Sequence, residues 1–183
     1  MNSFVFYRLR VFTCVLLLGG SVFAQTKPVV INRIVSRGFY APSKARTVDV
    51  VIVHSVYNSA GGDPYDVNLV LREFNRYRVS AHYIIARDGR IYKLVNEKDV
   101  SYHAGKGLLP DGRRRINVCS LGIELINSKA DSPTPQQINS LVALVKDIKS
   151  RYKINFVLRH SDIAPARKTD PWNMNWDDFM KRI

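Results

Sequence analysis

Short apolar runs alternate along this chain with segments in which apolar residues recur every three or four positions. The run at residues 48–53 is mostly β-branched and predicts a buried strand. Asp88-Gly89 is a favourable hairpin turn between two further apolar segments. The other predicted strands span residues 81–86, 90–95, 119–126 and 155–158.

Two segments have helical spacing. Asp63-Pro64 can start a helix that continues to about Tyr77, with apolar residues on one side. Thr134-Pro135-Gln136-Gln137 predicts a second helix start, with Thr as the cap and Pro in the first turn. The following apolar stripe is interpreted as core and contains Ile138, Leu141, Val142, Val145 and Ile148. Because strands and helices alternate, we expect a single α/β domain with a mixed sheet.

The N-terminus has the pattern of a secretory signal. Arg8 and Arg10 precede an apolar run at residues 11–18, and small residues lead to a cleavage-like site after Ala24. The run is shorter than the roughly 20 residues that span a bilayer. We therefore expect a signal peptide at 1–24, an irregular segment at 25–47 and the folded domain at 48–183. The expected location is periplasmic or secreted, and an uncleaved N-terminal anchor is the alternative.

Charge and cysteine content refine this picture. Cleavage would remove two arginines and no acidic residue, which lowers the net charge from +13 to +11. Such a charge favours an anionic partner, and for an exported protein the cell wall or a membrane surface fits better than nucleic acid. A generally basic surface is the simpler alternative. After cleavage Cys119 is the one remaining cysteine, so no internal disulfide is expected.

The segment from Arg159 to Pro171 carries the chemistry. It contains His160, Lys168 and Asp170, while His54 directly follows the run at residues 48–53. If the strands before His54 and His160 are neighbours, both imidazoles converge at one sheet edge and Asp170 can fold back to them. Two His and one Asp form a plausible catalytic zinc set with an open fourth position. Each histidine alone is more often a structural residue.

Six ordered motifs between residue 48 and the C-terminus resemble those of the zinc-dependent N-acetylmuramoyl-L-alanine amidases, a family shared with the peptidoglycan recognition proteins. The motifs are Val51-Ile-Val-His-Ser55, Val79-Ser-Ala-His-Tyr-Ile-Ile85, Arg87-Asp-Gly-Arg-Ile91, Tyr102-His-Ala-Gly105, Ser120-Leu-Gly-Ile-Glu124 and His160-Ser-Asp-Ile-Ala-Pro-Ala-Arg-Lys-Thr-Asp-Pro171.

This resemblance implies a mixed sheet flanked by helices, with one zinc ion in a groove. It implies His54, His160 and Asp170 as the zinc ligands, and hydrolysis of the amide between the lactyl group of N-acetylmuramic acid and L-alanine. Asp170 stands where the recognition proteins and phage enzymes usually have Cys, and Ala81 stands where they have Tyr. Both features resemble the bacterial recycling and periplasmic branch.

In that branch the motif glutamate is the catalytic group. The resemblance therefore implies that Glu124 takes a proton from the attacking water and returns it to the leaving nitrogen. Lys168 is expected to stabilise the oxyanion. Residues expected to bind substrate are Arg78, His103, Arg115, Asn117 and Arg167, each of which could instead be an ordinary surface or turn residue.

The expected partner is peptidoglycan or a muropeptide, and no nucleic acid or, after cleavage, integral membrane insertion is expected. Two other functions stay open at this point: a non-catalytic peptidoglycan-binding module, and a zinc peptidase that acts on wall peptides. His82 is interpreted as a structural residue inside the sheet. The oligomeric state and the form of the sugar, 1,6-anhydro or ordinary, do not follow from the residues.

Overall fold

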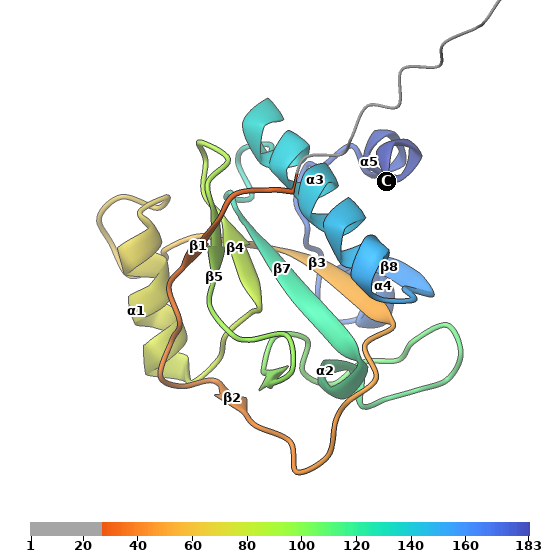
Figure 1. The fold of residues 1–183 in the computed structure, drawn as a ribbon. Coiled ribbons are helices and arrows are strands. Elements are labelled where there is room, and N and C mark those ends of the chain that lie inside the picture. The colour runs from red at the N-terminus through yellow and green to blue at the C-terminus, as the bar shows by residue number, and fades with distance from the viewer. Residues whose placement is uncertain (1–26) are drawn as a thin grey trace, which may run out of the picture.

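The fold is built on a central six-stranded sheet, seen in a computed structural model that describes residues 27–183 (Figure 1). The predicted signal peptide and its cleavage site lie outside the described residues. The strand order is β1-β5-β4-β7-β3-β8. The strands are β1 (Val30–Asn32), β3 (Val50–Val56), β4 (Tyr83–Ile85), β5 (Ile91–Lys93), β7 (Ser120–Ile126) and β8 (Phe156–Arg159).

Five helices and a small second sheet complete the described structure. The second sheet pairs β2 (Phe39–Tyr40) with β6 (Val100–Ser101) in antiparallel orientation. The helices are α1 (Val67–Tyr77), α2 (Ile116–Cys119), α3 (Pro135–Arg151), α4 (His160–Ile163) and α5 (Trp176–Arg182). None of these helices is both long and apolar enough to span a bilayer.

The central sheet is mixed, as expected. β4, β7, β3 and β8 run parallel to one another, whereas β4 and β5 pair in antiparallel orientation. The hairpin between β4 and β5 turns at Gly89, whose φ of 85° suits glycine. Its amide donates to the Ala86 carbonyl at 2.9 Å. The predicted α/β class and the hairpin are therefore confirmed.

The two faces of the sheet have different covers. Val51, Val53 and Leu121 belong to the core cluster that includes α3 and Phe179 of α5. Figure 1 shows α3 lying across this face of the sheet. On the opposite face, Val70 of α1 packs near Ile84, while Ile52 packs against residues of the 104–116 segment. Alternate residues of each strand thus point to opposite layers.

Both longer helices begin at a capping residue. Thr134 forms the predicted capping box of α3 with Gln137, and Pro135 occupies the first turn. The start of α1 differs from the prediction because Asp66, and not Asp63, accepts the first amide hydrogen bonds. The Asp63 side chain instead accepts from the Tyr65 amide in the preceding turn.

Two local differences bear on the site. β3 extends to Val56, so His54 lies inside the strand rather than after it. His160 does follow its strand directly, at the start of α4. The 25–47 segment, expected to be irregular, contains β1 and β2 within its described part. These strands are short and largely exposed, so they lack the apolar pattern that would have predicted them.

Candidate active site

Strand register brings the first two site residues together. His54 of β3 and Glu124 of β7 are direct partners across a parallel pair. Adjacent partners in a sheet point to the same face, so the imidazole and the carboxyl group lie side by side. Both side chains are buried, on the face opposite α3. The motif residues of two distant sequence segments thus meet through backbone pairing alone.

A folded-back loop brings in the other two. β8 lies beside β3 and ends next to His160, so the second imidazole reaches the same sheet edge. The loop then returns, and the Ser161 amide donates to the Asp170 carbonyl at 2.9 Å. This closure places the Asp170 carboxylate against His160, at 3.1 Å between Oδ2 and Nδ1.

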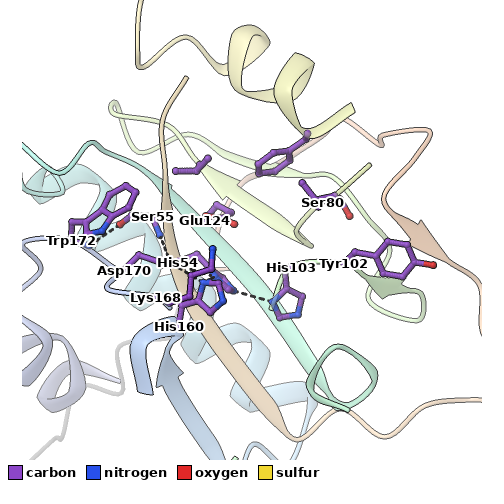
Figure 2. A pocket seen from close by; sticks show the side chains of 13 residues that line it. His54, Ser55, Ser80, Tyr102, His103, Glu124, His160, Lys168, Asp170 and Trp172 are labelled. Carbon is purple, nitrogen blue, oxygen red and sulfur yellow. Dashed lines mark hydrogen bonds and ion pairs between the residues drawn. The ribbon is translucent and has the colours of Figure 1, made fainter. Parts of the chain in front are cut away.

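Three donor atoms converge at this point (Figure 2). The Nδ1 atoms of His54 and His160 lie 2.9 Å apart, and Asp170 Oδ2 lies 3.6 Å from His54 Nδ1. All three residues are buried. Their geometry could hold one metal ion, and they are the three residues that were expected from the sequence to converge.

The hydrogen bond at Nε2 of His160 determines that its Nδ1 can bind a metal ion. His160 Nε2 lies 3.0 Å from the Ala104 carbonyl oxygen, which can only accept a hydrogen bond. Nε2 therefore carries the proton, and Nδ1 keeps its lone pair for a metal ion. The Ala104 peptide is itself held, since its amide donates to Asn117 Oδ1 at 2.9 Å and its carbonyl accepts from Arg167 at 2.7 Å.

Asp170 is fixed by the ends of β3 and β7. The Ser55 hydroxyl donates to Asn127 Oδ1 at 2.6 Å and accepts from the Trp172 amide at 3.1 Å. Asn127 Nδ2 also donates to the Trp172 carbonyl at 3.2 Å. Trp172 follows Asp170 by two residues, so these contacts set the position of the carboxylate. Neither Ser55 nor Asn127 was singled out from sequence, because each looks like an ordinary strand-end residue.

Burial and charge set the protonation of the site. Burial lowers the pKa of His54 to about 4, against the opposing effect of Asp170. For Asp170, burial acts to raise the pKa, but its close contacts with the imidazoles of His160 and His54 outweigh this effect and hold the pKa below its usual range. The His54 imidazole is therefore neutral and the Asp170 carboxylate is ionised at neutral pH, and these are the forms in which the two groups bind metals.

Glu124 is in a different electrostatic position. Burial raises its pKa well above the usual range, the Asp170 charge raises it further, and Lys168 acts in the opposite direction. Its Oε2 is buried and has no hydrogen-bond partner among the described residues. Leaving a polar atom unpaired costs about 1–3 kcal/mol. Such a carboxyl group is a candidate for proton transfer.

The pocket above these groups has polar and apolar walls (Figure 2). The four residues His54, Glu124, His160 and Asp170 line it together with Lys168. Val56, Phe74 and Val79 are apolar lining residues, and the aromatic side chains of Tyr102 and Trp172 also line the pocket. Trp176, in contrast, packs against Phe179 of the core at 5.2 Å between ring centres.

The five predicted substrate residues have different places. Arg78 and Arg115 are exposed and do not line the pocket, although Arg78 directly precedes the lining residues Val79 and Ser80. Asn117 and Arg167 hold the Ala104 peptide, as described above. His103 lines the pocket, but its two ring nitrogens lie 2.9 Å from His54 Nε2 and 3.0 Å from Ser120 Oγ.

His82 lies within the sheet as interpreted. Its Nδ1 accepts from the Gly122 amide at 3.0 Å, and its Nε2 donates to the Asp99 carbonyl at 3.1 Å. Burial lowers its pKa to about 3, so it is neutral. Both ring nitrogens are used by backbone groups, and His82 is a structural residue.

Comparison with known proteins agrees with this site. Residues 44–173 match the family described as N-acetylmuramoyl-L-alanine amidase. The 1,6-anhydro-N-acetylmuramyl-L-alanine amidase AmpD of Haemophilus influenzae is 37% identical over 115 residues, 61% of this chain and 62% of AmpD. The N-acetylmuramoyl-L-alanine amidase AmiD of Escherichia coli is 34% identical over 142 residues, 68% of this chain and 49% of AmiD. The chain thus spans less than two thirds of the length of these relatives.

Solved structures show the same fold. A selenomethionine AmpD crystal structure has a TM-score of 0.70 at 30% identity, covering 83% of this chain and 94% of that one. The Escherichia coli AmiD complex with anhydro-N-acetylmuramic acid-L-Ala-D-gamma-Glu-L-Lys has a TM-score of 0.65 at 30% identity, covering 78% and 60%. Sequence match, fold and site geometry agree: this chain belongs to the N-acetylmuramoyl-L-alanine amidase family.

Proposed function

We propose that this protein is a zinc-dependent amidase that hydrolyses the bond between N-acetylmuramic acid and L-alanine in peptidoglycan or muropeptides. The observation that carries this proposal is one pocket with two kinds of buried group. His54, His160 and Asp170 converge as metal ligands, and the unpaired carboxyl group of Glu124 lies beside them. A metal site adjacent to a buried acid is suited to hydrolysis.

Zinc fits the donor set best. Imidazole nitrogen and carboxylate oxygen are both common zinc ligands, and three protein ligands leave a fourth position open. Ligand atoms about 2.0–2.2 Å from one zinc ion with tetrahedral coordination would lie roughly 3.3–3.6 Å apart. The three separations here, 2.9, 3.1 and 3.6 Å, bracket that range. Bound zinc supplies Lewis acidity, which polarises a carbonyl group and promotes ionisation of water.

The protein's own groups supply the proton transfer and the charge stabilisation. Glu124 removes a proton from the water that attacks the lactyl carbonyl carbon. Lys168, in the same pocket, stabilises the negative charge that develops on the carbonyl oxygen. When the carbon–nitrogen bond breaks, Glu124 returns the proton to the L-alanine nitrogen. The products are a muramyl carboxylate and a stem peptide with a free amine.

The relatives support this substrate class. Several are named as amidases of muramyl-L-alanine bonds, and the AmiD structure contains an anhydromuramyl tripeptide. A non-catalytic binding module is less well supported, because this chain keeps all three ligands together with Glu124 and Lys168. A zinc peptidase that cuts wall crosslinks shares the site chemistry and is separated by its products.

The decisive measurement is a muropeptide digest analysed by mass spectrometry. The expected products are free stem peptides that begin at L-alanine, and a zinc chelator should abolish them. Glu124→Gln should retain about one zinc per chain while turnover falls by about 10²–10⁴-fold, since it keeps the shape of the side chain but cannot take up a proton.

Three results of this experiment would count against the proposal. Intact glycopeptides from the zinc-loaded protein would indicate a binding module, and cleaved crosslinks a peptidase. An active Glu124→Gln protein would rule out Glu124 as the proton acceptor. His160→Ala is the matched ligand control and should lose both zinc and activity.

Arginine contacts to the stem peptide form a second part of the proposal. Guanidinium groups bind carboxylates in bidentate fashion, and Arg78 lies beside the pocket residues Val79 and Ser80. Arg115, Arg167 and Asn117 are further candidates, as is His103, which lines the pocket. Arg78→Ala should raise KM several-fold with a smaller change in kcat. Arg76→Ala, an exposed residue on the same helix, is the charge-matched control, and equal KM values for both variants would contradict this role.

Export is a third part of the proposal, supported by the charged start, the apolar run and the small residues before Ala24. When the full chain is expressed in a Gram-negative host, the mature protein should be found in the periplasm or medium and begin at Gln25. N-terminal sequencing tests this directly. Membrane-bound protein that retains its first residues would indicate the uncleaved anchor.

A further inference from the structure

His103 faces a metal ligand and not only the pocket. Its Nδ1 lies 2.9 Å from Nε2 of His54 (Figure 2). Its Nε2 lies 3.0 Å from the Ser120 hydroxyl oxygen. The His54 and His103 rings meet edge to face, with ring centres 5.1 Å apart. Both ring nitrogens of His103 are therefore engaged by protein groups, and one of these groups, the His54 imidazole, is a candidate metal ligand.

The donor and acceptor in each of these hydrogen bonds can be assigned from the bond that the Ser120 hydroxyl makes on its other side. The Ser120 hydroxyl donates to the Ile116 carbonyl at 2.7 Å, and a carbonyl can only accept. Ser120 has no second proton, so its oxygen must accept from His103 Nε2. A neutral imidazole that donates through Nε2 accepts through Nδ1. His103 therefore accepts the proton of His54 Nε2, which leaves the lone pair of His54 on Nδ1. The assignment of the tautomer comes from the hydrogen-bond partners alone.

Gly122 makes room for the ring. A Cβ atom at this position would lie 2.4 Å from His103 Cγ and 2.6 Å from Nδ1, closer than atoms can approach. Glycine weakens the interior of a strand, so its presence in the middle of β7 indicates a close approach. Ser120, Gly122 and Glu124 alternate along one face of β7, beside Val50, Ile52 and His54 of β3.

We propose that His103 is a positioning residue that holds His54 in the tautomer whose Nδ1 binds the metal ion, with Ser120 fixing the direction of the hydrogen bonds and Gly122 admitting the ring. This inference rests on the proposed zinc function. It assigns two roles to the motif Ser120-Leu-Gly-Ile-Glu124. Ser120 and Gly122 orient a metal ligand, and Glu124 transfers protons. In this role His103 acts through His54.

The experiment compares zinc affinity and tautomer in matched variants. His103→Leu replaces the hydrogen-bond acceptor with an apolar side chain of similar size. It should weaken zinc binding by about 10–100-fold in a chelator competition. His103→Asn places Oδ1 near the position of Nδ1 and should stay within about threefold of the wild type. Gly122→Ala keeps every polar group but displaces the ring, and should resemble His103→Leu.

His82→Gln is the control for the loss of a buried imidazole, since His82 lies 5.8 Å from the His103 ring centre but contacts no metal ligand. It should change thermal stability and leave zinc affinity within about threefold. Circular dichroism in a chelator confirms that each variant folds. Long-range proton–nitrogen NMR of the wild type, which needs no variant, should show His54 protonated on Nε2.

The outcomes are distinct. A wild type without zinc affinity would refute the proposed function itself. If the wild type binds zinc but His103→Leu binds it equally well, or His82→Gln loses as much, the positioning role is wrong. A His54 ring protonated on Nδ1 in the metal-free wild type would also overturn it. Rescue of affinity by His103→Asn, with His54 protonated on Nε2, would establish it.

Discussion

The parallel register between β3 and β7 is the constraint on which the site depends. It pairs His54 with Glu124 and Ile52 with Gly122 across two strands that are far apart in the sequence. A shift of either strand by one residue would turn its own site side chain toward α3 and bury it among apolar groups, away from its partner. Two apolar residues of β3 and three of β7 belong to the core cluster that includes α3, so burial of that face holds the register in place.

The same register distributes the functions along one strand. On the site face of β7, Ser120 presents a hydroxyl group, Gly122 has no side chain and Glu124 presents a carboxyl group. The space above Gly122 is filled by His103, which links the hydroxyl of Ser120 to the ligand His54. A strand that carried only apolar residues on this face would be more stable. The strand therefore gives up packing for a ligand of defined orientation.

The sequence predicted what short-range patterns encode. The hairpin at Gly89 and the capping box at Thr134 depend on neighbouring residues, and both were correct. The three candidate ligands were correctly expected to converge, because two of them are adjacent to apolar strand residues. The roles of Ser55, Asn127 and Ser120 could not be predicted, since their partners are 72, 72 and 17 residues away. Their residue types also occur at many strand ends, so no local signal marks them.

Glu124 shows why stability alone does not explain this arrangement. Its unpaired, buried oxygen carries an energetic cost, and the Asp170 charge adds to the effect of burial on its pKa. A hydrogen-bond donor near Oε2 would remove this cost, but it would also stabilise the ionised form and weaken the carboxylate as a base. Lys168 opposes the pKa shift without a hydrogen bond to Glu124. The site thus keeps a buried carboxyl group with a raised pKa, which makes its ionised form a stronger base and suits a group that must both take and return a proton.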